Sequence, residues 1–179
     1  SDFTALSSMS EITSKLFAIV NKENQKMFYG SDNQNLGFSP AIEVINNKKI
    51  NGYMFKAEPV SGRSGCYLLR LMTLSGSAYS IWGSPGYLNS QPATGGCCFI
   101  LGFKEQNGQD IKDGAVWEIK YEEGNGFTLK NVGTGKYLQD AAPAKYSAPA
   151  YFDFLKDGGT TGINAVERTV VDDDAVYTL

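Results

Sequence analysis

The residues that usually carry out catalysis are scarce in this sequence of 179 residues. It contains no histidine, which excludes a Ser-His-Asp triad, a Cys-His dyad and every histidine metal ligand. Glu118, Glu122 and Glu123 lie on one expected hairpin, whereas glycoside hydrolysis needs two carboxyl groups that face each other about 5–9.5 Å apart. A nucleophilic Cys66 would lack a histidine base. We therefore expect a protein without enzymatic activity and without a cofactor.

The charged residues indicate neither a nucleic-acid surface nor a metal site. Sixteen basic and nineteen acidic residues give a formal net charge of −3, and no basic cluster is longer than Lys48-Lys49. A nucleic-acid surface needs a basic face that neutralises phosphates. The acidic run Asp172–Asp174 is typical of a solvated turn and lacks the alternating spacing of an EF-hand calcium loop. We expect no nucleic-acid partner and no bound metal.

Side chains suited to binding are more frequent than side chains suited to catalysis. Aromatic residues make up 12% of the chain, and each ring offers a flat apolar face on which a ligand can stack. Trp82 lies within Ser80–Gly86, a stretch rich in Gly, Ser and Pro that predicts a loop. The indole is either exposed there and available for stacking, or it covers the open end of the fold.

These side chains must be positioned by short β-strands. Twenty glycines, only six prolines and short alternating apolar runs favour strands joined by tight turns. Such strands open at Phe17, Tyr67 and Phe127, at similar intervals along the sequence, and a hairpin signal follows each of them. This recurrence indicates an internal repeat.

A second set of aromatic residues supports the repeat. Phe55, Trp117 and Tyr177 recur at almost the same interval, each in a short strand. Three four-stranded units must pack on one another to bury their apolar faces and to remove exposed strand edges. The last strand, Val176–Leu179, is therefore expected to lie beside the strand at Phe17 and to close a barrel.

The predicted organisation is a single all-β domain that follows a short N-terminal lead segment. Apolar residues recur every third position in the lead, which permits a short helical turn packed on the domain. The expected boundaries are residues 1–14 for the lead segment and 15–179 for the domain, with units at about 15–65, 66–125 and 126–179.

The third unit carries a more specific motif, Phe127-Thr-Leu-Lys-Asn-Val-Gly-Thr-Gly-Lys-Tyr-Leu138. It resembles a hairpin of the ricin-B-like β-trefoils, carbohydrate-binding modules common in secreted proteins, including those of gut bacteria. The resemblance implies a β-trefoil with pseudo-threefold symmetry, a carbohydrate or glycoprotein partner, and a secreted or cell-surface location. The Gln-x-Trp motif of that family is absent, since Trp117 follows Ala115-Val116. That departure favours the alternative of a protein-interaction module, such as a protease inhibitor or an adhesin without a sugar site.

The resemblance also implies where a ligand would bind. The family's carboxylate position falls on Asp140, which is expected to act with Phe154 and Asp157 in the third unit. Asx residues also satisfy turn backbones and phenylalanines also fill cores, so each candidate has a structural alternative. The corresponding candidates of the second unit are Asn89, Phe103 and Asn107, with Trp82 beside them.

The remaining features concern the redox state of the cysteines, the oligomeric state and the cellular location of the protein. Cys66, Cys97 and Cys98 leave at least one thiol unpaired in a monomer, and Cys66 is either paired with one of the others or reduced. No apolar run approaches eighteen residues, so we expect no membrane span. We expect a monomer whose signal peptide has been removed before Ser1.

Overall fold

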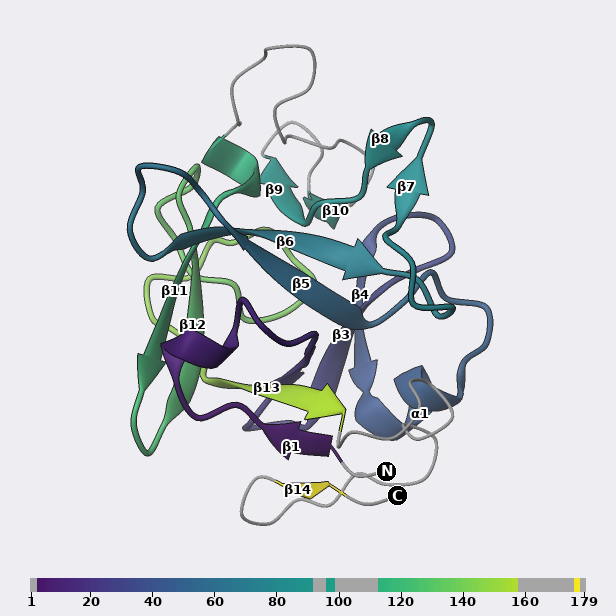
Figure 1. The fold of residues 1–179 in the computed structure, drawn as a ribbon, viewed down its shortest axis with the longest axis horizontal. Helices are drawn as coiled ribbons and strands as arrows, with labels where there is room; N and C mark the ends of the chain where they lie inside the picture. Colours follow the sequence, from purple (N-terminus) through teal and green to yellow (C-terminus); the bar gives the residue numbers. More distant parts are fainter. Residues whose placement is uncertain (1–2, 92–95, 99–112, 158–175, 178–179) are drawn as a thin grey trace.

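The computed structural model describes residues 3–91, 96–98, 113–157 and 176–177, and their regular structure is almost entirely β-strand (Figure 1). Helix within these residues is confined to α1 (Ala41–Asn46) and to 3-10 turns at Met9–Glu11 and Asp113–Ala115. The predicted all-β class is therefore confirmed. The strands are β1 (Phe3–Ala5), β2 (Ala18–Asn21), β3 (Lys26–Gly30), β4 (Leu36–Pro40), β5 (Met54–Pro59), β6 (Cys66–Met72), β7 (Ser80–Ile81), β8 (Ser84–Pro85), β9 (Asn89–Gln91), β10 (Gly96–Cys98), β11 (Trp117–Glu122), β12 (Gly126–Asn131), β13 (Phe152–Asp157) and β14 (Val176–Tyr177).

Eight strands follow one antiparallel path, in the order β4-β3-β2-β13-β12-β11-β6-β5. Two short strands extend it at the side, because β1 pairs with β13 and β14 pairs with β1. The hairpin β7–β8 and the pair β9–β10 form separate two-stranded sheets. All eight strands of this path contribute residues to the main core, including Phe28 of β3 and Leu36 of β4.

Three strand contacts on the path are equivalent and give the fold its trefoil-like, threefold character. The first residue of each predicted strand lies opposite an aromatic residue of another strand. The three pairs are Phe17 with Phe55, Tyr67 with Trp117, and Phe127 with Phe152.

The partner in the third unit is not the residue that the sequence predicts. Phe152 takes the place expected for Tyr177, and β13 rather than the end of the chain runs beside β2. Tyr177 lies opposite Phe3 in the β14–β1 pair instead. The two paired aromatic residues of the third unit are closer together in the sequence than those of either other unit. A prediction that assumes a nearly constant repeat length therefore selects a residue, Tyr177, that lies too far along the chain.

The predicted closed barrel is also only partly formed. The strand path is open, with β4 and β5 as its two ends. Only an isolated bridge joins β5 to the start of β2, where Phe17 and Phe55 exchange two backbone hydrogen bonds with N···O distances of 3.0 and 2.7 Å. The two strands meet at this residue pair rather than along a continuous ladder.

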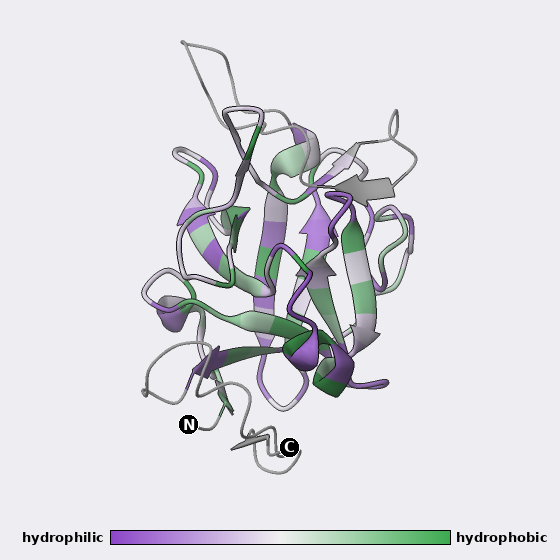
Figure 2. Ribbon diagram, turned by 90° about the vertical axis from the view of Figure 1, so that its right-hand side faces the viewer, coloured by the Kyte–Doolittle hydropathy of each residue, from purple (hydrophilic) through white to green (hydrophobic). Residues whose placement is uncertain are grey.

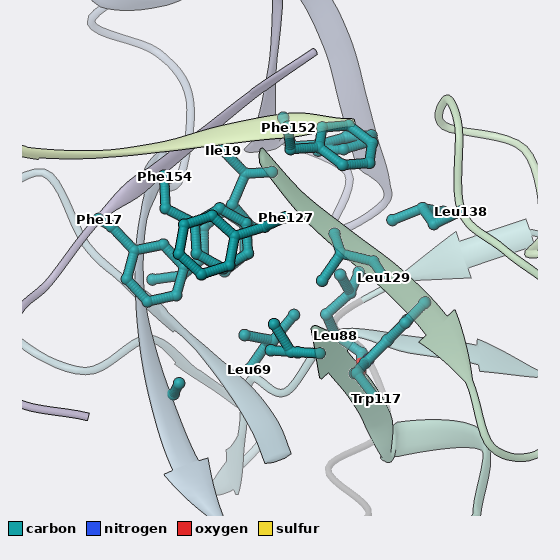
Figure 3. Packing of buried hydrophobic residues seen from close by; sticks show 14 of the residues in the cluster. Phe17, Ile19, Leu69, Leu88, Trp117, Phe127, Leu129, Leu138, Phe152 and Phe154 are labelled. Atoms are coloured by element: carbon teal, nitrogen blue, oxygen red, sulfur yellow. The ribbon is translucent and has the colours of Figure 1, made fainter. Parts of the chain in front are cut away.

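The core is built from aromatic rings on the inner faces of these strands (Figure 3). The ring of Phe154 is stacked between those of Phe17 and Phe127, with centroid distances of 4.4 and 4.2 Å. Trp117 is buried near them, and its Nε1 donates a hydrogen bond of 2.9 Å to the carbonyl oxygen of Leu88. Figure 2 shows apolar and polar residues alternating along several strands, as expected for strands with one buried face.

Candidate functional site

Phe154 is not the exposed aromatic platform that the sequence analysis predicts. Its side chain is 0% exposed and lies in the middle of the aromatic stack of the core. Because successive side chains of a strand point to opposite faces, Phe152 and Phe154 both point inward. Phe154 is therefore a core residue, and its prediction as a ligand-binding residue is wrong.

Asp140 is held in place by its own loop. Its Oδ1 accepts a hydrogen bond from the backbone N–H of Ala142 at 2.9 Å, and its Oδ2 accepts one from the Tyr146 hydroxyl at 2.6 Å. The carboxylate raises the pKa of Tyr146, because the hydroxyl donates to it. Asp140 is thus joined to an aromatic ring, but the ring belongs to Tyr146 rather than to Phe154.

Asp157 does not converge with Asp140. It is half-buried at the far end of β13, opposite Phe3, whereas Asp140 follows Gln139, whose carbonyl oxygen accepts from Asn21 at the near end. The strand rises about 3.3 Å per residue, so the five steps from Phe152 to Asp157 cover roughly 17 Å. The predicted third-unit site is therefore not assembled as one pocket.

Of the predicted residues of the second unit, the structure describes Asn89 and Trp82. Asn89 is 0% exposed in β9, where its Nδ2 donates to the carbonyl oxygen of Tyr87 at 3.4 Å, so it is a structural residue. Phe103 and Asn107 lie outside the described residues. Trp82, in contrast, is 81% exposed at the turn between β7 and β8, which agrees with the stacking alternative and not with a cover over the fold.

A hollow of about 330 Å³ lies where three chain segments meet at the start of β13. Phe152 pairs with Asn21 of β2 and with Phe127 of β12, which brings the turn after β2 and the β11–β12 turn to the approach of β13. We call this cavity the Tyr151 hollow. Its lining residues are Asn21, Lys22, Glu23, Asn125, Pro149, Ala150 and Tyr151.

Glu122 fixes two polar groups at the edge of the Tyr151 hollow. Its Oε2 accepts a hydrogen bond from the Tyr151 hydroxyl at 2.7 Å, and its Oε1 accepts one from Asn125 Nδ2 at 2.8 Å. These hydrogen bonds lower the pKa of Glu122 and raise that of Tyr151. The carboxylate is therefore ionised at neutral pH and orients an aromatic ring and an amide together.

Lys22 ties the turns around the hollow to one another. Its backbone N–H donates to the carbonyl oxygen of Tyr151 at 3.0 Å, and its Nζ donates to the carbonyl oxygen of Asn125 at 2.8 Å. Gly126 permits this close approach, because its φ is +120° and an added Cβ would lie 2.7 Å from the carbonyl oxygen of Phe152. The hollow is thus a built feature of three joined turns.

Tyrosines continue along the chain beside the hollow. Tyr137 and Tyr146 are half-buried and face each other in an isolated bridge, and each ring lies under a lysine ammonium group at 5.6 Å from the centroid. Those ammonium groups belong to Lys130 and Lys145. The loop that carries Asp140 and Tyr146 thus leads directly into the Tyr151 hollow.

Tyr151 and Asn125 are not among the binding residues predicted from the sequence. The sequence Gly124-Asn125-Gly126 does indicate a turn, but nothing in it shows that the turn packs beside residues 149–151. Tyr151 directly precedes β13, which pairs with β12. Its position beside the β11–β12 turn could be predicted only if this strand pairing were known.

Other kinds of site are absent from the part of the chain that the structure describes. No three His, Cys, Asp or Glu residues there are grouped closely enough to hold a metal ion. No helix there has the length and apolar character needed to cross a membrane. Cys66 is a free thiol, and burial raises its pKa.

Comparison with known proteins relates this chain to solved structures only. No protein-family model and no curated protein matches it. The designed threefold-symmetric protein ThreeFoil is 19% identical with a TM-score of 0.47, and the alignment covers 79% of this chain and 98% of ThreeFoil. A GH43 β-1,3-galactosidase is 12% identical with a TM-score of 0.51, over 98% of this chain and 29% of the enzyme. The chain thus shares its fold with less than a third of that galactosidase.

Proposed function

We propose that this protein is a non-catalytic carbohydrate-binding module whose Tyr151 hollow holds the end of a glycan. The observation that carries the proposal is the Tyr151–Glu122–Asn125 arrangement, in which one carboxylate orients an aromatic ring and an amide beside the same cavity. Sugar recognition needs a flat apolar face against the C–H groups of the ring, together with donors and acceptors for neighbouring hydroxyls.

The remaining groups around the hollow favour an uncharged, hydroxyl-rich ligand. Lys22 offers an ammonium group and Glu23 a carboxylate, so consecutive residues of one turn supply both a donor and an acceptor to the lining of the hollow. With Glu122 as the second carboxylate, the site offers no net positive charge to an anion. A cavity of about 330 Å³ is at the small end of ligand pockets and fits one or two sugar rings.

The finer fold and location belong to the same proposal. We assign the chain to the ricin-B-like β-trefoils, supported by the Phe127–Leu138 hairpin and by the three equivalent aromatic strand contacts. A module of that kind acts on glycans outside the cell, so secretion is expected. Fractionation of the source cells, with detection of the protein in the medium or on the surface, tests this location.

The binding proposal is tested by calorimetric titration with β-1,3-linked galactobiose, galactose and a panel of other disaccharides. The GH43 galactosidase that shares the fold is named for β-1,3-galactosidase activity, which makes galactobiose the first probe. We expect saturable one-site binding of at least one sugar. Tyr151→Ala is expected to weaken it about tenfold or more, and Asn125→Ala several-fold.

A control variant distinguishes the loss of a sugar contact in the Tyr151 hollow from the effect of removing any exposed apolar side chain. Ile42→Ala removes an exposed apolar residue of α1, outside the lining of the hollow, and should bind like the wild type. If no sugar of the panel binds, or if Tyr151→Ala binds as tightly as Ile42→Ala, the proposed function is wrong.

A further inference from the structure

The hairpin that carries Trp82 is an insertion into the threefold framework. Leu88 N–H donates to the carbonyl oxygen of Leu69, and Leu138 N–H makes the same bond to Leu129, each at 2.9 Å, so these residues are equivalent in two units. The first pair encloses the long segment 70–87, whereas the second encloses only the segment 130–137. The second unit therefore contains a stretch of chain that its framework does not require.

The base of this insertion is firmly attached. Tyr79 is buried, its N–H donates to the carbonyl oxygen of Leu71 at 2.9 Å, and its carbonyl oxygen accepts from Gly86 N–H at 3.0 Å. Arg70 donates to the same carbonyl oxygen at 2.7 Å and to the Ser80 hydroxyl at 3.1 Å. The tip of the hairpin therefore projects from a fixed base and is not a loose loop.

Trp82 occupies the tip although the turn does not favour it. Ile81 pairs with Ser84, so Trp82 and Gly83 form a two-residue turn with φ values of +51° and +75°. Turns with two positive φ angles favour Asn or Asp followed by Gly, because a bulky side chain is strained in that region. With 81% of its surface exposed, the indole gains little from packing to offset the strain. Neither the turn preference nor packing within the chain therefore accounts for a tryptophan at this position.

The residues around Trp82 in the sequence indicate which kind of partner its indole would suit. No charged residue occurs in the sequence between Arg70 and Lys104, although 20% of the chain is charged. The hairpin itself carries hydroxyl groups instead, because Ser80 lies in β7 and Ser84, which pairs with Ile81, lies directly after the turn. A hairpin tip that carries an indole and serine hydroxyls, with no charged residue of its own, matches an uncharged partner that is itself rich in hydroxyls.

We infer that Trp82 forms a second glycan contact, which binds an uncharged polysaccharide by stacking on a sugar ring. The inference rests on the proposed function for its class of ligand but uses a different part of the molecule. Figure 1 places the β7–β8 hairpin and the β11–β12 turn of the Tyr151 hollow at opposite sides of the fold. A long polysaccharide, or two chains, can therefore occupy the two places, whereas a disaccharide reaches only one.

Two other partners fit the observations less well. A protein interface surrounds its aromatic anchor with further buried contacts, but the other large exposed apolar side chains of the described residues are Leu16 in the N-terminal segment and Ile42 on α1. Adsorption to an anionic membrane is favoured by basic residues beside the apolar tip, but the hairpin carries none, and the guanidinium group of Arg70 donates to Tyr79 and Ser80 at its base. A protein or a membrane is therefore an alternative result of the test below.

The test compares Trp82→Asn with the wild type on three uncharged polysaccharides, β-1,3-galactan, mannan and xylan, by affinity electrophoresis. Asn suits the turn, so this variant should unfold at the same or a higher temperature, and a loss of binding cannot be assigned to misfolding. We expect at least one polysaccharide to bind the wild type and Trp82→Asn to bind it about tenfold or more weakly. Trp82→Phe should retain part of the affinity, and galactobiose titration of the Tyr151 hollow should be unchanged in both variants.

Fluorescence gives an independent measurement on the unaltered chain. The chain has two tryptophans, and Trp117 is buried, so acrylamide should quench mainly the emission of Trp82. Polysaccharide is expected to protect this emission from quenching. If Trp82→Asn binds every polysaccharide like the wild type, or if phosphatidylcholine vesicles protect the indole and the polysaccharides do not, the inference is overturned. If galactobiose still binds in that case, the proposed function stands without it.

Discussion

Glu122 organises the Tyr151 hollow although it does not line it. It is an exposed carboxylate at the end of β11, yet it accepts hydrogen bonds from both the Tyr151 hydroxyl and the Asn125 amide. Removing its charge would leave two groups of the hollow without the acceptor that aligns them. In the proposed function this residue would therefore act on a ligand only through its neighbours, as a positioning residue.

The pH dependence of sugar binding should follow the ionisation of Glu122. Its pKa in the folded protein is lowered from its ordinary value of 4.5 by the two hydrogen bonds, so its contribution is fully present above that value and is lost as the pH falls through the lowered pKa. We expect the affinity for galactobiose to be constant between pH 7 and 5 and to fall only at more acidic pH. Titrations of the wild type and Glu122→Gln check this. The interpretation fails if affinity already declines near neutral pH, or if Glu122→Gln shows the same acid loss as the wild type.

Phe154 should affect stability and not binding. Its ring is enclosed by Phe17 and Phe127, so Phe154→Leu loses stacking contacts and leaves unfilled volume in the core. We expect a loss of about 1–3 kcal/mol in urea unfolding, with unchanged affinity for sugar in the folded protein. A variant that keeps its stability and loses sugar binding would restore the ligand-platform role for this residue.

Individual residue types were predicted better than their partners. Asp140 was predicted as a ligand-binding carboxylate that acts with Phe154, and the structure joins it to an aromatic ring, but to that of Tyr146. In Phe152-Asp153-Phe154 apolar residues alternate with a polar one, which favours burial of both phenylalanines on one face of the strand. The core alternative for Phe154 was therefore available from the sequence, whereas the partner of Asp140 depends on the course of a loop, which such a pattern does not show.

The turns that follow β2 and β12 are two versions of one structural element. In the first, Gln25 N–H donates to the carbonyl oxygen of Asn21 at 2.9 Å, and in the second Gly135 N–H donates to that of Asn131 at 2.8 Å. Both closing residues have positive φ, +59° for Gln25 and +69° for Gly135. The third unit thus has glycine where the first unit places a glutamine in a conformation that favours glycine.

Gln25→Gly should therefore stabilise the protein. The left-handed region costs a residue with a Cβ roughly 1–2 kcal/mol, part of which is offset by the greater freedom of glycine in the unfolded chain. We expect a net gain of about 0.5–1 kcal/mol in the free energy of unfolding, measured in urea. Gly135→Gln is the matched reverse change and should destabilise. If the wild type and both variants unfold with the same free energy, the two turns do not make the same conformational demand on their closing residue, and the proposed equivalence is wrong.

The positions of strands along the sequence could be predicted wherever the repeat keeps a nearly constant length. The strands at Phe17, Tyr67 and Phe127 occur where the spacing places them. The last place of the third unit was assigned to Val176–Leu179 instead of the strand at Phe152, because Phe152 follows Phe127 much sooner in the sequence than Trp117 follows Tyr67. Insertions such as the Trp82 hairpin change the length of a unit without changing its framework, and spacing alone cannot locate them.

At the scale of the molecule, β13 completes the strand path. It lies between β2 and β12, and the only strand described after it, β14, adds two residue pairs to the edge strand β1. Residues after Asp157 therefore supply no strand to the central path among those described. Within the described residues, the strands of the third unit on this path therefore span a shorter stretch of sequence than those of the other two units.

Truncation after Asp157 tests this architecture. A chain of residues 1–157 retains all six strands from β2 to β5 along the path, so we expect cooperative unfolding and sugar affinity equal to that of the full chain. Circular dichroism melting and galactobiose titration provide the measurements. A truncated chain that unfolds without cooperativity would show that the C-terminal segment, as the repeat spacing first suggested, is needed to complete the fold.

The most direct test of the central claim is to map where a sugar contacts the folded protein. Titration of ¹⁵N-labelled protein with galactobiose, followed by amide chemical shifts, reports on each turn around the Tyr151 hollow without a mutation. The account predicts saturable shifts that are largest at Lys22, Glu23, Asn125 and Tyr151, and small at the buried strands. An absence of saturable shifts across the panel of sugars, or shifts confined to residues distant from these turns, would contradict it.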